Sequence, residues 1–358
     1  GENPAHRIIR KVIQNKKIND PEKLKSFAYN SYTKLTAPTE IELGDTSVFK
    51  GGQHSHLDKH YDFFMETYAA RVFKNGKSKE KVLSTRVSGL KDPSFGLLSS
   101  EFQSFSFYTD IIDVAGKNYV TPISDGAIGK YFYLIEDTLF NNKDTVYVIS
   151  YRPFKNRNFD GIKGLLYINT SSYAIQSVTA SPADDIPKVG VKIEQLYEKT
   201  DSVHWFPVQL NTGLVITAPV FKDGKKVRED KLTFSGKSYL TNIRIDIPLS
   251  DAEFDEVAVS YAPDAAKKEE SYWAEVRKDS LSSKEKETYH VVDSIGKKHN
   301  LDAKIKLFES LVNGRLPLGY VDARLDRLIN FNDYEGFRLG LGAVTNNRFS
   351  ERFSIGGY

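Results

Sequence analysis

Seven short stretches between residues 145 and 247 are rich in β-branched, aromatic and apolar residues, and polar turns separate them. This composition, with a period of two where one face is wet, is typical of β-strands. Consecutive strands joined by short turns predict an antiparallel meander. No alternation of strand and helix patterns appears, which argues against a parallel nucleotide-binding sheet. The predicted strands are Thr145–Phe154, Lys163–Ile168, Tyr173–Ala180, Val189–Glu198, His204–Asn211, Leu214–Thr217 and Lys237–Ile247.

The last of these strands shows the alternation most clearly. Successive side chains of a strand point to opposite faces of the sheet. We therefore expect one face to carry Tyr239, Thr241, Ile243, Ile245 and Ile247, and the other to carry Leu240, Asn242, Arg244 and Asp246.

The chain begins with a helical pattern. Asn3-Pro4 is typical of a helix N-cap followed by proline at the first helical position. The apolar residues from Ile8 to Ile13 then fall on one face. We expect a helix over about Pro4–Gln14.

More strands are predicted between this helix and the meander. The period changes to two over Phe27–Glu42, and Phe63–Phe73 alternates as well, although a helix is also compatible with the second stretch. Lys74–Lys81 is typical of a turn, and Lys81–Leu90 has the pattern of the returning strand.

The character of the chain changes after about Ser250. Ala265–Thr288 is dense in Lys and Glu, and its apolar residues are few apart from Tyr272, Trp273 and Val276, so we expect one or two solvated helices. Asn300–Val312 has apolar residues at helical spacing and predicts an amphipathic helix that stops at Asn313-Gly314.

The tail returns to strand-like spacing. From Phe337 to Ala343, and again from Phe349 to Ile355, apolar residues alternate with small or charged ones. A transmembrane barrel strand shows this pattern, and so does a strand of a soluble sheet. A closed barrel needs about eight strands or more. This tail has room for a few, so it is either the beginning of a longer barrel or an ordinary hairpin.

Composition limits the classes of function. A chain of 358 residues predicts two or three domains, and 40% hydrophobic residues suffice for packed cores. A net charge of +3, from 50 basic and 47 acidic residues, gives no electrostatic reason to expect nucleic acid as a partner. The absence of cysteine excludes catalytic thiols, disulfides and thiolate metal sites. We find no apolar run long enough for a transmembrane helix and no secretory signal peptide.

One histidine-rich stretch is a candidate metal site. His54, His56 and His60 lie within seven positions, with Asp58 among them. Imidazole nitrogens ligate zinc, and carboxylates complete or orient such sites. The spacing is similar to the His-x-His-x-Asp-His motif of the metallo-β-lactamase fold, but one residue is inserted before the last histidine. The motif also follows Lys50-Gly51-Gly52, which is typical of a loop and not of a buried strand, so we favour a polar surface loop without metal.

Other candidate sites have ordinary structural explanations. Asp184-Asp185 lies between two prolines, as in a solvated loop. Two aromatic clusters, Tyr131-Phe132-Tyr133 and Trp205-Phe206-Pro207, could line an apolar pocket, but core packing explains them. The basic run Lys222–Arg228 is typical of a hairpin tip. No Gly-x-Ser-x-Gly elbow, Walker loop or His-Glu-x-x-His motif occurs, so we assign no catalytic residue, metal ligand or cofactor.

Longer stretches resemble a known family. They are NPAHRIIRKVIQNKK, RVSGLKDPSF, EFQSFSFYTD, YFYLIEDTL, DTVYVISYRPFKNRNFDGIKGLLYINTSSYAIQSV, WFPVQLNT, GKSYLTNIRI and NDYEGFRLGLGAVTNN. They resemble Bacteroidota outer-membrane proteins of unknown function, in which a carboxypeptidase-regulatory-like domain precedes this region and a β-barrel follows it. The resemblance implies that this chain is the middle, periplasmic region plus the start of the barrel, and that it is part of a longer protein.

A second resemblance concerns architecture. Phe159–Val178 forms a Phe-x-Gly-x-x-Gly-x-Leu-x-Ile strand, a turn and a returning strand. This hairpin is similar to the repeat of lipoprotein-carrier and lipoprotein-receptor half-barrels, which wrap a curved antiparallel sheet around an apolar cavity. The resemblance implies a fold more than a function.

The sequence therefore predicts a mainly β (α+β) fold. We expect an N-terminal helix over residues 1–19, a curved antiparallel sheet or half-barrel over 20–249, a helical connector over 250–315 and the start of a C-terminal outer-membrane β-barrel over 316–358.

Three functions are compatible with this fold. The favoured one is a non-enzymatic periplasmic module of an outer-membrane barrel protein that binds an apolar ligand, such as a lipid or lipoprotein, or a partner protein during envelope assembly or export. The main alternative is a structural scaffold whose sheet is filled by its own side chains. The third is a metal-dependent hydrolase centred on His54, His56 and His60. An unfilled apolar cavity favours the carrier, an exposed apolar or β-edge patch favours the scaffold, and a bound metal with an open position favours the hydrolase.

Overall fold

A computed structural model of the chain describes most of its residues. These are residues 3–37, 39–40, 60–61, 63–89, 106–114, 117–141, 144–184, 189–222, 225–254, 258–295, 315–318, 320–324, 330–332, 336–338, 342–345, 349–350 and 353–357.

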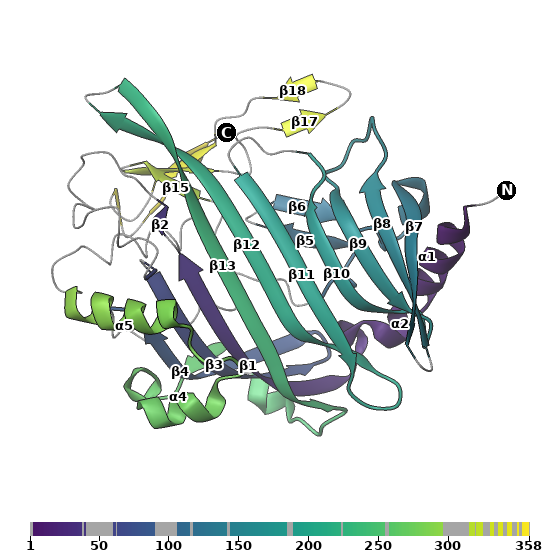
Figure 1. The fold of residues 1–358 in the computed structure, drawn as a ribbon, viewed down its shortest axis with the longest axis horizontal. Helices are drawn as coiled ribbons and strands as arrows, with labels where there is room; N and C mark the ends of the chain where they lie inside the picture. The colour runs from purple at the N-terminus through teal and green to yellow at the C-terminus, as the bar shows by residue number, and fades with distance from the viewer. Residues whose placement is uncertain are drawn as a thin grey trace.

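A large curved sheet of 12 strands dominates the fold, as the sequence predicted (Figure 1). Its order is β14-β4-β3-β1-β13-β12-β11-β10-β9-β8-β7, and β2 pairs with β13 beside this path. All neighbours are antiparallel except β14, which is parallel to β4. The strands are β1 (Ser26–Ala37), β2 (Thr39–Glu40), β3 (Phe63–Lys74), β4 (Lys77–Val87), β7 (Tyr131–Asn141), β8 (Asp144–Pro153), β9 (Ile162–Asn169), β10 (Ala174–Pro182), β11 (Val189–Lys199), β12 (Trp205–Lys222), β13 (Lys225–Ile245) and β14 (Val259–Tyr261).

The strands β8 to β13 form the predicted meander, and β7 extends it by a strand that was not predicted. Two boundaries differ, because β13 begins at Lys225 instead of Lys237 and β12 is longer than predicted. The stretches His204–Asn211 and Leu214–Thr217 are not two strands, because β12 runs without interruption through both. Thr212 in its middle lies opposite Ile193 of β11 and Gly236 of β13. Neighbours on both sides hold Asn-Thr-Gly extended, although these residue types favour turns.

The region Phe63–Phe73 is a strand and not a helix. It forms a hairpin with β4, and the turn is shorter than the predicted Lys74–Lys81 because β4 already begins at Lys77. Asn75 and Gly76 have φ angles of 48° and 83°. Positive φ at both central residues is the signature of a two-residue hairpin turn, which an Asn-Gly pair favours.

The alternation predicted for Lys237–Ile247 is wrong at one point. Ala28 lies opposite Arg244 and Asn30 opposite Thr241, so β13 carries an extra residue between these pairs. Asn242 adopts a φ of 53° there. Such a bulge shifts the following side chains to the other face. Ile243 and Ile245 therefore pack with the cluster that contains Leu240 instead of sharing a face with Tyr239.

The helix α1 (Pro4–Gln14) has the predicted bounds. The Asn3 side chain accepts a hydrogen bond from the Ala5 amide at 2.9 Å and caps the helix. The buried residues Ala5, Ile8, Ile9 and Val12 attach α1 to the main hydrophobic core. The helix α2 (Lys16–Asn19) and the 3₁₀ turn η1 (Pro21–Lys23) then lead into β1.

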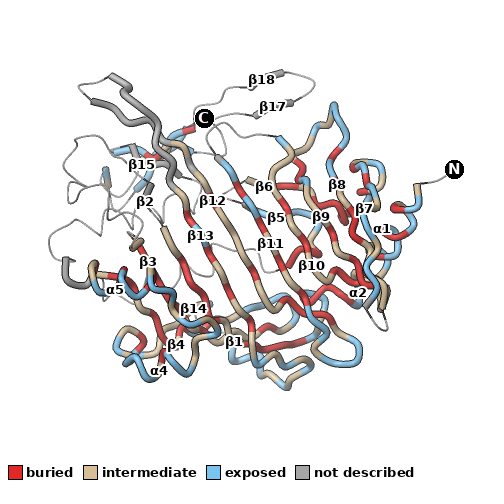
Figure 2. Tube along the Cα trace, in the orientation of Figure 1, coloured by how far each residue is buried: buried red, intermediate tan, exposed pale blue. Residues whose placement is uncertain are grey.

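The sheet has two differently covered faces. The core face carries Leu35, Met65 and Leu214, and α1 and the segment around Phe107 pack on it at the β7–β11 end. Figure 2 shows the buried residues of this end as a dense group beside α1 and α2. The small hairpin of β5 (Ile111–Val114) and β6 (Lys117–Val120) and the 3₁₀ turn η3 (Ala127–Gly129) belong to the same covering segment.

The opposite face, here called the helix face, contacts α4 (Glu270–Val276) and α5 (Ser283–Ile295). Two helices were predicted as one possibility for Ala265–Thr288, but they are not simply solvated. Trp273 and Tyr289 are 1% and 4% exposed. The 3₁₀ turns η4 (Asp251–Phe254) and η5 (Ala265–Lys267) connect β13 with α4. No described helix is long and apolar enough to cross a membrane.

The described part of the tail forms short strands. The strands β15 (Arg315–Leu318), β16 (Val321–Arg324), β19 (Ala343–Thr345) and β20 (Gly356–Gly357) make one small sheet, and β17 (Asn330–Asn332) pairs with β18 (Gly336–Arg338). The predicted helix over 300–312 lies outside the described residues. The division into four regions and the assignment of the tail to a barrel stay predictions.

Candidate binding surfaces

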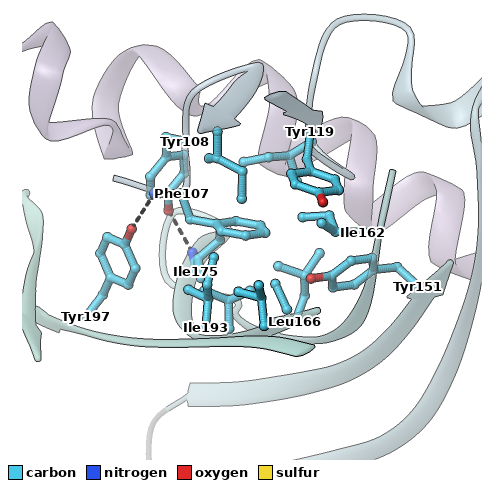
Figure 3. Close-up of a cluster of buried hydrophobic side chains, with 14 of the residues drawn as sticks. Phe107, Tyr108, Tyr119, Tyr151, Ile162, Leu166, Ile175, Ile193 and Tyr197 are labelled. Carbon is cyan, nitrogen blue, oxygen red and sulfur yellow. Dashed lines mark hydrogen bonds between the residues drawn. The ribbon is translucent and has the colours of Figure 1, made fainter. Parts of the chain in front are cut away.

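The core face at the β7–β11 end is filled by the chain's own side chains. Phe107 and Tyr108 are fully buried above β10 and β11. The Tyr197 hydroxyl accepts a hydrogen bond from the Phe107 amide at 2.8 Å, and the Tyr108 hydroxyl accepts one from the Ile175 amide at 2.7 Å (Figure 3). These two tyrosines attach the covering segment to the sheet, where a carrier would need open space.

Further tyrosines make the filling specific. Tyr131 donates to the Val120 carbonyl at 2.5 Å, Tyr133 to the Pro122 carbonyl at 2.6 Å and Tyr151 to the Thr179 carbonyl at 2.7 Å. Burial raises the pKa of all three hydroxyls, so they stay neutral donors. These residues therefore form part of a hydrogen-bonded core.

A glycine allows the Tyr151 contact. A Cβ at Gly164 would lie 1.9 Å from the Thr179 carbonyl oxygen and 3.0 Å from the Tyr151 hydroxyl. Only a residue without a side chain fits between β8 and β10 at this point. The second glycine of the Phe-x-Gly-x-x-Gly pattern is therefore explained by close packing within the sheet.

The strand β7 forms an exposed apolar edge. It is the last strand of the sheet order and pairs on one side with β8. No second strand pairs with it in the part of the chain that the structure describes. Phe132, Leu134, Leu139 and Phe140 are 37%, 48%, 43% and 83% exposed. The Asn3 side chain already donates to the Tyr133 carbonyl at 2.7 Å, and Glu136 and Asp137 lie at a bulge in the middle of β7. The part of this edge that offers a surface to another chain is therefore the end with Leu139 and Phe140.

A buried carboxylate lies at the centre of the helix face. Glu66 of β3 is fully buried and accepts hydrogen bonds from Arg277 Nε at 2.6 Å and Arg277 Nη2 at 2.8 Å. The hydroxyls of Tyr32 and Tyr289 donate to it at 2.6 Å and 2.8 Å. Four donors thus surround one carboxylate, which satisfies a charge that would otherwise be very costly to bury.

Two further polar contacts hold the helical segment on this face. Lys34 of β1 pairs with Glu285 of α5 at 3.1 Å, and both side chains are largely buried. Glu285 also accepts from the Ser282 amide at 2.7 Å, and its own amide donates to the Ser282 hydroxyl at 3.2 Å. This reciprocal pair is a capping box, so one glutamate both starts α5 and attaches it to the sheet.

The candidate metal site, for which the sequence favoured a polar loop without metal, falls largely outside the described residues. His54, His56 and Asp58 are not described, and His60 Nδ1 lies 3.0 Å from the Tyr61 carbonyl oxygen. Within the described ranges, no group of three metal-ligating side chains occurs. The structure therefore does not test the hydrolase hypothesis.

The other sequence candidates lie apart from one another. Asp184 pairs with Arg157 in a loop, and Asp185 lies outside the described residues. Tyr131 and Tyr133 are core residues, whereas Phe132 between them points to the other face and is partly exposed. The Arg152 guanidinium lies over the Phe132 ring, 4.7 Å from the centre of that ring.

The remaining two candidates are structural. Trp205 and Phe206 are buried in two different clusters, so they do not form one pocket. Lys222 ends β12 and lies opposite Lys225 at the start of β13, which confirms the predicted hairpin at the basic run.

Sequence reasoning did not identify the Glu66 cluster. Its members come from β1, β3, the C-terminal end of α4 and α5 itself, so no sequence motif unites them. One signal was present, because Glu66 is the only charged residue in the apolar run from Phe63 to Ala70. A carboxylate at a buried position of a strand needs a cationic or hydrogen-bonding partner, although spacing does not reveal which.

Comparison with solved structures finds distant similarities, among them the following two. A DUF1329 family protein from Desulfovibrio piger is 13% identical with a TM-score of 0.31, and the alignment covers 71% of this chain and 98% of that one. A structure reporting lipid–protein interactions in lipovitellin is 9% identical with a TM-score of 0.25, covering 64% of this chain and 26% of that one. Neither similarity is close enough to support an argument about fold or function.

Comparison by sequence is more informative. A search of curated proteins finds no match. A family model described as a family of unknown function, DUF5686, matches residues 8–224. This match includes α1 from Ile8 onward, the covering segment on the core face and the strands from β1 to β12. Because it spans more than half of the 358 residues, the chain belongs to the DUF5686 family.

Proposed function

We propose that the chain is a non-enzymatic interaction module of an outer-membrane protein, lying mostly in the periplasm, and that it binds a partner protein along β7. The exposed apolar edge carries this proposal. An extended segment of a partner can add to an open strand through main-chain hydrogen bonds, while its side chains contact the apolar residues on that strand. Leu139 and Phe140, near the β7–β8 turn, offer the largest contiguous apolar exposure on β7.

The filled core face favours a partner protein over an apolar ligand. A carrier needs a dry cavity that buries most of its ligand. At the β7–β11 end of this sheet, α1, Phe107 and Tyr108 occupy that position. The scaffold alternative therefore agrees better with the described residues than the lipid or lipoprotein carrier does.

The location in the envelope is supported by sequence features. The stretches quoted above resemble outer-membrane proteins of Bacteroidota over nearly the whole chain. In the tail, Phe353 and Ile355 are each 62% exposed, and they alternate with Ser354. Residues 353–355 lie outside the strands of the structure, so it is the alternation in the sequence that supports this location, because a lipid-facing strand requires such a pattern.

Site-specific crosslinking tests the proposed partner surface. A photo-crosslinking amino acid is placed at Phe140 in the full protein in its native envelope, and Ile18 on α2, which is 47% exposed, serves as the control position. We expect a discrete adduct at Phe140 that Leu139→Lys removes, and none at Ile18. Equal labelling at both positions, or no adduct at Phe140, would overturn the proposal.

Native mass spectrometry separates the partner protein from an apolar ligand. The purified chain is measured without detergent and without a histidine tag. The bare polypeptide mass agrees with the scaffold. A stoichiometric mass increment that resolves into lipid or acyl species would instead support the carrier hypothesis and contradict the scaffold hypothesis.

A further inference from the structure

A second surface, independent of β7, lies between α4, α5 and the end of β4. It is an open groove of about 910 Å³. Its lining includes Arg86, Arg277, Lys278, Lys286, His290 and Glu270. Grooves of this volume are the usual size for small-molecule sites. Four permanently cationic side chains face a single carboxylate in it, so the lining is strongly basic in a chain whose net charge is only +3.

The two arginines of the groove are fixed in position. Arg277 is held from below by both oxygens of the buried Glu66, as described above. The Arg86 guanidinium lies 3.7 Å from the centre of the Tyr289 ring, and the Tyr289 hydroxyl is itself bonded to Glu66. Guanidinium groups held in this way recognise oxyanions with little loss of side-chain entropy.

Both arginines already bind one carboxylate. Arg86 Nη1 donates to Glu270 Oε2 at 2.8 Å, and Arg277 Nη1 donates to Glu270 Oε1. Glu270 is the first residue of α4, and its side chain is 61% exposed. It can therefore leave the arginines at small cost, because exposed ion pairs contribute little to stability.

The two lysines of the groove are free for a ligand. Neither the Lys278 nor the Lys286 ammonium has an acidic partner among the described residues, and both side chains are exposed. Glu285, one position before Lys286, is already paired with Lys34. The groove thus combines two fixed guanidiniums with two unpaired ammonium groups.

We propose that this groove binds a phosphate monoester, whose oxygens replace the Glu270 carboxylate on Arg86 and Arg277 while Lys278 and Lys286 neutralise the remaining charge. The phosphate oxygens would accept hydrogen bonds from Arg86 Nη1 and Arg277 Nη1, the two groups that now donate to Glu270, and the lysines add point charge. A lipid headgroup and a soluble phosphorylated compound share this chemistry.

Titration calorimetry on the whole chain tests the site with defined probes. The probes are glycerol 3-phosphate, which is a soluble phosphate monoester, and vesicles of phosphatidylcholine that contain either phosphatidic acid, also a monoester, or an equal charge of phosphatidylglycerol, a diester. The variants are Lys278→Glu/Lys286→Glu, Glu270→Gln and, as a matched control, Lys155→Glu in the exposed loop before β9. All of these positions are exposed, so the fold is retained.

The variants give opposite expected changes. Losing two charge-assisted contacts in the double lysine variant should weaken binding at least about tenfold. Glu270→Gln removes the competing carboxylate and should tighten binding, which a merely structural Glu270 would not do. Lys155→Glu should leave binding unchanged.

The probes distinguish the source of the phosphate. Binding of glycerol 3-phosphate in solution with this variant pattern identifies a soluble phosphate monoester. Binding only to phosphatidic acid vesicles, with the same pattern, identifies a lipid headgroup. The proposal is overturned if no probe binds, if the double lysine variant binds as well as Lys155→Glu, or if Glu270→Gln does not tighten binding.

Discussion

Arg277 donates hydrogen bonds to both carboxylate oxygens of Glu66, although 211 positions separate the two residues. The Glu66 side chain is fully buried and that of Arg277 is 7% exposed. Because burial alone lowers the pKa of Arg277 while Glu66 and Glu270 raise it above its ordinary value, the guanidinium stays charged. The helical segment cannot detach from the sheet without leaving Glu66 unpaired.

Removing this carboxylate should be severely destabilising. Glu66→Ala leaves Arg277, Tyr32 and Tyr289 without their shared acceptor, and breaking a buried pair in this way costs about 3–5 kcal/mol. Denaturant unfolding followed by circular dichroism measures the change. The control Glu198→Ala, at an exposed position of β11, should shift stability by less than about 0.5 kcal/mol. Equal effects of the two variants would contradict the assigned role of Glu66.

Two buried tyrosines of the core face should respond in opposite directions. The Tyr119 hydroxyl has no hydrogen-bond partner among the described residues, whereas the Tyr133 hydroxyl donates to the Pro122 carbonyl. Tyr119→Phe should therefore leave stability unchanged or raise it by about 1 kcal/mol, and Tyr133→Phe should lower it by about 1–2 kcal/mol. Thermal melts of the two variants side by side measure the difference. A larger loss for Tyr119→Phe would be incompatible with this packing.

Alanine substitutions at two glycines, Gly164 in β9 and Gly213 in β12, test whether the close packing of β9 between β8 and β10 requires glycine. At Gly164 an added Cβ would meet the Thr179 carbonyl oxygen at 1.9 Å, whereas at Gly213 of β12 it would meet nothing within 4 Å. Gly164→Ala should cost about 1–3 kcal/mol or more through backbone displacement. Gly213→Ala should be neutral or stabilising by up to about 1 kcal/mol. The melting temperatures of the two variants measure the difference, and an equal change in both would contradict the assigned role of Gly164.

The attachment of α4 should weaken in acid. The hydrogen bond from Arg277 lowers the pKa of Glu270 below its ordinary value of 4.5. A carboxyl whose folded pKa is lowered adds stability that is complete above pH 4.5 and is lost as pH falls through the folded pKa. Because the side chain is largely exposed, the contribution is below about 1 kcal/mol and screened by salt. Melts between pH 7 and pH 3 should fall less steeply in Glu270→Gln.

The histidine-rich stretch should bind no metal stoichiometrically. The sequence around His54, His56 and His60 favours a polar loop, and the described residues contain no group of three metal-ligating side chains that could complete a zinc site. Elemental analysis of protein purified without a histidine tag measures the content. One equivalent of a transition metal that His54→Ala removes would revive the metal-dependent hydrolase.

Local elements were predictable because each leaves a periodic pattern in the sequence. The helix α1 has its predicted bounds because the Asn3-Pro4 cap and the apolar row from Ile8 specify it locally. The meander from β8 to β11 follows from alternation and short turns in the same way. The sequence predicted that an exposed β-edge is one possible partner surface, but it did not predict which strand forms that edge. Whether a strand lies at the edge depends on which strands pair with it and not on its own residues.

Long-range relationships were not predictable. Nothing in Ser26–Ala37 indicates that it pairs with β13, because any strand with one apolar face could do so. The bulge at Asn242 changed the faces of β13, since one extra residue reverses a period of two. The Glu66 cluster and the basic groove require three segments to meet, and only the fold brings them together.

The pairing of β1 with β13 also means that β1 must wait for its partner strand during synthesis. Thr33 and Ser238 share a hydrogen bond across this seam, although 205 positions separate them. At ordinary rates of synthesis, about 5–20 residues per second, the partner strand emerges roughly 10–40 s after β1 does. Until then one edge of β1 has no strand to pair with. A newly made chain is therefore most prone to pair β1 with a wrong strand before β13 is available, and the exposed edge belongs to the three-stranded unit of β1, β3 and β4.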